Sequence, residues 1–220
     1  MPLILNVPFA EKDIAKSKGA RWNPELKKWI APKKKYYSDF VDWVSKDAFY
    51  TIICDHFYIV EGTRTCYKCQ QPTHVIGFGI EDYYSVEPDE DEAKANKHWI
   101  NSCINKELIR ITSEIKPLPE LVSQYIQNTW NNKISHSRKT QRPYLSNRCD
   151  HCGALQGKFP LFCEVDSPFF IHTPEDAAKL TLYKITLQYD LIVEELELGY
   201  SSTDFLIKGN AKMVDSGIQL

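Results

Sequence analysis

The chain has 220 residues, of which 43% are hydrophobic and 25% are charged, and its formal net charge at pH 7 is −2. This composition is that of a folded globular protein and excludes a wholly disordered chain. The sequence contains no run of about 18 or more apolar residues, which excludes a membrane-spanning helix. The first residues lack the basic, apolar and small-residue segments of a secretion signal, so we expect a cytoplasmic protein.

Charge is distributed unevenly along the chain. Residues 1–46 contain ten Lys or Arg and five Asp or Glu, whereas residues 47–220 contain 17 basic and 24 acidic residues. A basic module on an acidic body is typical of proteins that contact nucleic acid. A lysine-rich face that is simply solvated explains the same pattern.

The amino-terminal residues predict a small unit with the order βαββα. The pattern indicates a strand at residues 3–7, a helix at 11–18 that ends at Gly19, a hairpin over 21–31 and a helix at 36–44. We therefore expect a separate basic module at residues 1–47.

The remaining residues, 48–220, predict a β-rich body with a helical insertion at about residues 90–135. The expected elements are strands at 49–60 and 74–80, an exposed acidic loop at 81–92, helices at 93–106 and 119–134, a strand at 159–162, a helical turn at 174–176 and a strand at 185–193. The predicted fold class is α+β.

Two Cys-x-x-Cys pairs predict a structural zinc site with Cys66, Cys69, Cys149 and Cys152 as ligands. Gly153 can adopt the positive φ that the turn after such a pair often requires. The pairs are separated by 79 residues, far more than in a compact zinc ribbon. Two unrelated reduced pairs, or a redox dithiol, are the alternative interpretations.

Aromatic and basic residues lie close together in the first module, a combination that proteins use to bind single strands. The alternative is that its two tryptophans form the core of the module. The candidate nucleic-acid-binding residues are Arg21, Trp22, Lys27, Lys28, Trp29, Lys33, Lys34 and Lys35.

Catalytic patterns are absent from the sequence. It contains no Gly-rich phosphate loop, paired-carboxylate signature or Ser/His/Asp pattern. Cys54 and His56 share a face of the strand predicted at 49–60, but a buried strand cysteine is far commoner than a catalytic couple. Cys163 follows the second pair closely enough to be a spare ligand, but we expect it on a core strand. We therefore predict a protein that is not an enzyme.

The first module resembles a known small domain. Residues 6–16 read NVPFAEKDIAK and residues 18–32 read KGARWNPELKKWIAP. Over residues 3–32 the chain is similar to a bacterial domain of unknown function that recurs in plasmid-borne TraC-type DNA primases. This resemblance implies a nucleic-acid context.

A second resemblance covers residues 50–170. The chain reads CYKC at residues 66–69 and NRCDHCGALQG at residues 147–157. These motifs resemble those of uncharacterised bacterial zinc-ribbon proteins, which supports the zinc site.

Two functions follow as hypotheses. The first is a zinc-binding protein that associates with DNA or RNA through its basic module. The alternative is a protein-interaction factor, such as an inhibitor, immunity or adaptor protein, whose acidic body captures a basic partner through residues 81–92. Neither hypothesis involves a membrane or a small-molecule substrate.

Overall fold

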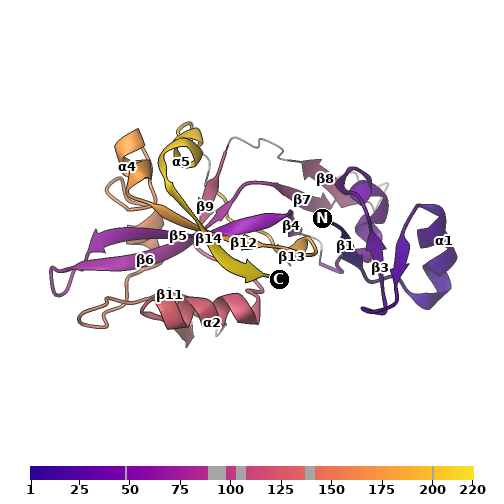
Figure 1. The fold of residues 1–220 in the computed structure, drawn as a ribbon, viewed down its shortest axis with the longest axis horizontal. Helices are drawn as coiled ribbons and strands as arrows, with labels where there is room; N and C mark the ends of the chain where they lie inside the picture. The colour runs from indigo at the N-terminus through magenta and orange to yellow at the C-terminus, as the bar shows by residue number, and fades with distance from the viewer. Residues whose placement is uncertain (48, 89–97, 103–107, 137–141, 200) are drawn as a thin grey trace.

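The computed structural model describes residues 1–47, 49–88, 98–102, 108–136, 142–199 and 201–220. Its strands and helices form an α+β fold, as predicted. The molecule is elongated, with the amino-terminal module at one end of the long axis (Figure 1). Among the described residues, no helix combines the length and apolar character needed to cross a bilayer.

The amino-terminal module contains a three-stranded antiparallel sheet in the order β1-β3-β2. Its last helix is a 3₁₀ helix, η2, in which Tyr37, Phe40 and Trp43 are buried at intervals of three residues. Three residues form one turn of a 3₁₀ helix, so these side chains share one face. The predicted βαββα order is confirmed. The elements are β1 (Leu3–Leu5), η1 (Phe9–Glu11), α1 (Lys12–Ser17), β2 (Arg21–Asn23), β3 (Lys28–Ala31) and η2 (Lys34–Trp43).

Two larger sheets form the body. The five-stranded sheet has the order β14-β12-β5-β6-β9, and the four-stranded sheet has the order β13-β4-β7-β8. Their strands are β4 (Tyr50–Ile53), β5 (His56–Thr65), β6 (Pro72–Ile80), β7 (Tyr83–Pro88), β8 (His98–Ser102), β9 (Arg110–Thr112), β12 (Thr181–Thr186), β13 (Leu191–Glu194) and β14 (Lys212–Gln219). The body also contains a hairpin and four helices, which are β10 (Asn132–His136), β11 (Pro143–Asn147), α2 (Glu120–Thr129), α3 (Lys158–Phe162), α4 (Pro174–Ala178) and α5 (Phe205–Asn210).

Three stretches of chain connect one large sheet directly to the other. β4 leads into β5, β6 into β7, and β12 into β13, and each of these pairs has one strand in each sheet. The predicted single strands at 49–60 and 185–193 are therefore wrong. The first breaks at Asp55, whose φ of 61° lies in the left-handed region that Asp tolerates better than most residues.

Several other expectations for the body are also wrong. Residues 83–88 of the predicted acidic loop form β7, and Glu81 and Asp82 before it are buried. Residues 98–102 of the helix predicted at 93–106 form β8, and the other residues of that helix lie outside the described residues. Among its described residues, the expected insertion at 90–135 contains one helix, α2, together with strands β8, β9 and β10. Residues 158–162 form helix α3 rather than a strand.

The helix predicted after Pro119 is confirmed, but it is shorter than expected. α2 ends at Thr129, and Val122 and Ile126 are its buried residues. Leu121 is exposed, and Ile134 lies on β10 with its side chain exposed. The apolar face of the helix is thus narrower than the sequence pattern indicates.

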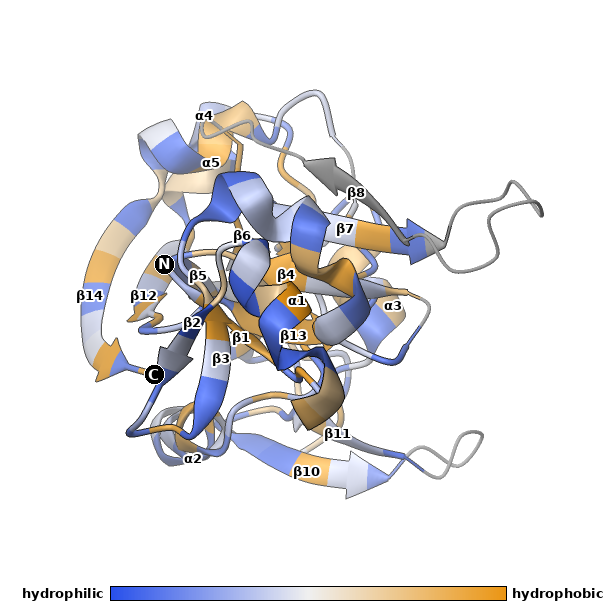
Figure 2. Cartoon of the chain, turned by 90° about the vertical axis from the view of Figure 1, so that its right-hand side faces the viewer, coloured by the Kyte–Doolittle hydropathy of each residue, from blue (hydrophilic) through white to orange (hydrophobic). Residues whose placement is uncertain are grey.

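One buried cluster continues from the amino-terminal module into the body. Leu3, Leu5 and Tyr37 of the module share it with Tyr50 and Ile52 of β4. Figure 2, which faces the module, shows hydrophobic strand segments in the middle of the molecule around β4. This core crosses residue 47, and a domain boundary near that residue stays a prediction.

Candidate metal centre and basic surface

The four cysteines of the two Cys-x-x-Cys pairs lie together. Their sulfur atoms are all within 4.8 Å of one another. Cys66 Sγ is 3.7 Å from Cys152 Sγ, and Cys69 Sγ is 3.6 Å from Cys149 Sγ. These distances exclude disulfide bonds, in which the sulfurs are about 2.05 Å apart. They match the edge of about 3.8 Å in a tetrahedron whose centre is about 2.3 Å from each sulfur. The four cysteines can therefore hold one metal ion.

The two Cys-x-x-Cys turns have the same backbone structure. In each, the N–H of the first cysteine donates to the carbonyl five residues later, and its own carbonyl accepts from the N–H four residues later. The donor–acceptor pairs are Cys66 with Gln71 and Gln70, and Cys149 with Ala154 and Gly153. The residue four positions after the first cysteine has a left-handed φ in both turns, 60° at Gln70 and 69° at Gly153. The sequence predicted this conformation for Gly153 only, because glutamine gives no such signal.

Direct hydrogen bonds hold the two turns side by side. The side chain of Asn147, at the end of β11, accepts from the N–H of Ile76 at 2.7 Å and donates to its carbonyl at 2.9 Å. Beyond it, the N–H of Asp150 donates to Thr73 Oγ1 at 2.9 Å, and the N–H of His74 donates to Asp150 Oδ2 at 2.9 Å. Strand β6 therefore positions the second turn as well as leading away from the first.

The surroundings of the sulfur atoms favour a bound cation. Buried Gln156 donates its Nε2–H to Cys66 Sγ, 3.4 Å away. Backbone N–H groups of Cys69 and Lys68 lower the pKa of the Cys66 thiol to about 6. A backbone hydrogen bond from Gln71 acts in the same direction at Cys69, but burial and the neighbouring sulfurs outweigh it and raise its pKa to about 12. One thiolate forms readily and the next resists ionisation beside it, a repulsion that a dication would relieve.

Trp22 and Trp29 face each other across β2 and β3. Their ring centroids are 5.7 Å apart in an edge-to-face arrangement. Trp29 packs partly buried against the module's core, whereas the side chain of Trp22 is 51% exposed. With Lys27 and Lys28 they line part of a groove of about 670 Å³.

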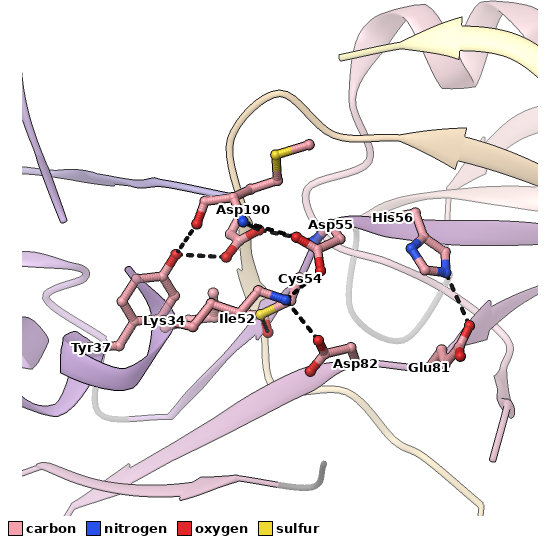
Figure 3. A network of polar contacts seen from close by, with 10 residues as sticks. Lys34, Tyr37, Ile52, Cys54, Asp55, His56, Glu81, Asp82 and Asp190 are labelled. Carbon is pink, nitrogen blue, oxygen red and sulfur yellow. Dashed lines mark hydrogen bonds and ion pairs between the residues drawn. The ribbon is translucent and has the colours of Figure 1, made fainter. Parts of the chain in front are cut away.

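The remaining predicted cations are not part of this groove. Arg21, Lys33 and Lys35 are exposed. Lys34 instead points toward the body, where its Nζ lies 2.5 Å from Asp55 Oδ2 and 2.7 Å from Asp82 Oδ2 (Figure 3). The structure thus places Lys34 in an internal ion-pair network and leaves the others on the surface.

That network lies where the three chain stretches pass between the two large sheets (Figure 3). Asp190, whose side chain is fully buried, accepts from Tyr37 OH at 2.6 Å and from the N–H of Asp55 at 2.9 Å. Lys34 and Tyr37 both belong to η2, so the bonds that these two side chains make to the three aspartates join the amino-terminal module to the body. The sequence gives no signal for this cluster, because its acidic residues come from three distant segments.

Burial and pairing set the charge states in this network. Burial opposes the charge of Lys34, but hydrogen bonds to Asp55 and Asp82 outweigh it and raise its pKa. Burial raises the pKa of Asp190 despite its hydrogen bond from Tyr37. Neutral Asp190 is therefore easier to form than an ordinary aspartic acid, whereas Lys34 stays charged.

A second group of polar side chains continues the network on the five-stranded sheet. Glu81 Oε2 lies 3.0 Å from both His56 Nε2 and Tyr58 OH, and Glu81 Oε1 pairs with Lys208 of α5. Burial disfavours the charge of Glu81, but its bonds to Lys208 and His56 outweigh burial and lower its pKa.

The remaining sequence candidates do not form a second centre. Cys54 is buried, and burial raises the pKa of its thiol. His56 lies beyond the break at Asp55, and its ring nitrogen is bonded within the Glu81 group. Cys163 is exposed at the end of α3, so the expected core strand position is wrong.

Comparison with known proteins identifies one domain. Residues 3–45 match the model of a domain of unknown function (DUF5710). The predicted amino-terminal domain of unknown function is thus confirmed, while its link to plasmid primases and the zinc-ribbon resemblance of the body stay predictions. No curated protein and no solved structure is significantly similar to the chain.

Proposed function

We propose that the protein is a non-enzymatic zinc-binding protein that associates with nucleic acid through its basic amino-terminal module. The observation that carries the zinc assignment is the group of four sulfur atoms within 4.8 Å of one another. Thiolate ligands suit zinc, whereas Mg²⁺ and Ca²⁺ prefer oxygen ligands. Tetrahedral sulfur sites also suit iron, so the identity of the metal needs a measurement.

The proposed role of the ion is structural. All four tetrahedral positions are filled by cysteines, so no position remains for water or substrate. The ion would join the turn after β5 to the turn after β11, as the two knuckles of a zinc ribbon do. In the elongated molecule the β5–β6 hairpin points away from the amino-terminal module (Figure 1), so the ion would stabilise the end opposite the nucleic-acid contact.

Exposed cations on the module support the nucleic-acid contact. Arg21, Lys27, Lys28, Lys33 and Lys35 are all exposed, whereas residues 47–220 carry a net negative charge. Lysines of this kind bind phosphates without reading sequence. Lys34 does not belong to the proposed contact surface, because Asp55 and Asp82 neutralise it.

The alternative of an acidic capture surface receives less support. Glu81 and Asp82, the first two acids of residues 81–92, are buried and paired with Lys208 and Lys34. They are therefore not available to a basic partner.

Metal analysis of the purified protein tests the zinc assignment. Inductively coupled plasma mass spectrometry should give about one zinc per chain. X-ray absorption spectroscopy should show sulfur-only ligation at about 2.3 Å. Iron in place of zinc, or a nitrogen or oxygen ligand, would contradict the assignment.

Mobility-shift assays with single- and double-stranded DNA and RNA test the nucleic-acid contact. The double variant Lys33→Gln/Lys35→Gln should weaken binding equally for all sequences and reduce the slope of log K against log salt by about 1.5. The matched control is Lys184→Gln/Lys212→Gln, which removes the same charge from exposed positions of the body. If wild-type protein shifts no nucleic acid at low salt, this part of the proposal fails.

A further inference from the structure

A groove opens in the amino-terminal module beside the outer strand of its sheet. The chain after β1 and the β2–β3 hairpin form its walls, and its volume is about 670 Å³. This volume lies within the range of about 300–1,000 Å³ that is usual for small-ligand pockets. The aromatic residues of its lining are Phe9, Trp22 and Trp29, and the basic ones are Lys12, Lys27 and Lys28.

Two of the aromatic rings that line the groove are exposed to solvent. Phe9 is 82% exposed and Trp22 is 51% exposed. Trp22 lies on β2, the outer strand of the sheet order β1-β3-β2, and among the described residues no strand pairs with the free edge of β2. Its partner Trp29 lies on the central strand and is fixed by the core. The Trp22 indole therefore packs against Trp29 on one side and leaves about half of its surface open to solvent.

Lysines surround these rings, and none of the described residues that line the groove is acidic. The Nζ of Lys12 lies 4.0 Å from the centroid of the Phe9 ring. The Nζ of Lys28 is held 3.2 Å from Asn6 Oδ1. Lys27 occupies the turn between β2 and β3 with a left-handed φ of 52°. A ligand that fits this lining combines a flat aromatic face with negative charge.

We propose that this groove binds one unpaired base of a single-stranded nucleic acid. The base stacks on Trp22 and Phe9, and the phosphates on either side of it contact Lys12, Lys27 and Lys28. This inference rests on the nucleic-acid association proposed above and adds a preference for single strands. In a duplex, neighbouring base pairs cover both faces of each base, so stacking on the indole would first require unstacking.

Binding of a single-stranded oligonucleotide and of a duplex of the same sequence tests the inference. Wild-type protein should bind the single strand more tightly. Trp22→Ala should weaken single-strand binding by about 5- to 150-fold, which is the usual effect of losing one base–aromatic stack, and should leave duplex binding unchanged. Trp22→Phe should restore most of the loss, because its ring still offers a face for stacking.

Two controls distinguish the loss of base stacking from unfolding and from non-specific binding by any exposed aromatic ring. Thermal melting must show that Trp22→Ala is folded, which we expect because the side chain is half exposed. Phe159→Ala removes an aromatic ring from α3 of the body that is 64% exposed, more than Trp22, and should not change binding. The variant Lys27→Gln/Lys28→Gln should reduce the salt dependence of single-strand binding.

The outcomes distinguish the groove from the broader proposal. If Trp22→Ala is folded and binds the single strand as wild type does, or if it loses duplex binding equally, the base-stacking inference is overturned while nucleic-acid association stands. If wild-type protein binds neither nucleic acid at low salt, both the association and the groove inference are overturned.

Discussion

Gln156 is a single residue on which the affinity of the metal centre should depend. Its Nε2 donates to Cys66 Sγ. Mutation of a residue that hydrogen-bonds to a metal ligand typically lowers the metal affinity by about 10- to 100-fold. Gln156→Ala should therefore weaken zinc binding by that factor in a competition titration with a coloured chelator. Gln71→Ala is the matched control: it removes an exposed glutamine side chain from the first turn, keeps the backbone bonds of Gln71 to Cys66 and Cys69, and should bind zinc normally. Equal affinities for the two variants would show that the hydrogen bond to sulfur is unimportant.

Glu81 should contribute stability that depends on pH. Its pKa is lowered from the ordinary value of 4.5 in the folded protein, so its contribution is present above that value and is lost as pH falls through the folded pKa. At neutral pH, Glu81→Gln should lower the free energy of unfolding by about 2 kcal/mol, because it weakens charged hydrogen bonds in a buried site. The difference from wild type should shrink in denaturant titrations as the pH is lowered below 4.5. Exposed Glu87 provides the control: Glu87→Gln should show no such dependence.

At the scale of elements, the attachment of β11 to β6 depends on one side chain. Asn147 satisfies both the N–H and the carbonyl of Ile76, and Asn147→Ala would leave two buried backbone groups without their partner. We expect a loss of about 3 kcal/mol in the free energy of unfolding, measured by denaturant titration. Lys133→Ala, at an exposed position of the neighbouring strand β10, should change it by less than about 0.5 kcal/mol. Similar losses for both variants would contradict the role given to Asn147.

The elements that the sequence predicted well are those set by local signals. Gly19 follows the end of α1, and Pro119 precedes the start of α2. The two Cys-x-x-Cys motifs likewise identify four cysteines that the structure places together. The breaks of the long strands were missed because they arise from contacts between distant residues. Asp55 turns where its N–H meets Asp190, 135 positions away in the chain. The aromatic and β-branched residues at 49–60 give no sign of such a partner, although Asp55 and His56 interrupt them.

For the whole molecule, removal of the metal should loosen the body. Cys69 and Cys149 are 80 positions apart, so the proposed ion would close a long loop that hydrogen bonds alone hold less firmly. Chelation of zinc, or Cys149→Ser, should lower the melting temperature by about 10 °C or more. Cys163→Ser removes an exposed cysteine outside the group and should melt as wild type does. A chelated protein that melts like the metal-bound one would exclude a structural ion.

The same separation fixes when the centre can form during synthesis. At about 5–20 residues per second, a ribosome needs about 4–16 s to travel the 80 positions from Cys69 to Cys149. Throughout that interval the nascent chain carries two thiols of a half-built site, whose partners have not yet been translated. Capture of the proposed zinc ion would therefore come late in the synthesis of each new chain, and Cys66 and Cys69 would stay open to oxidation until the ribosome has passed residue 152.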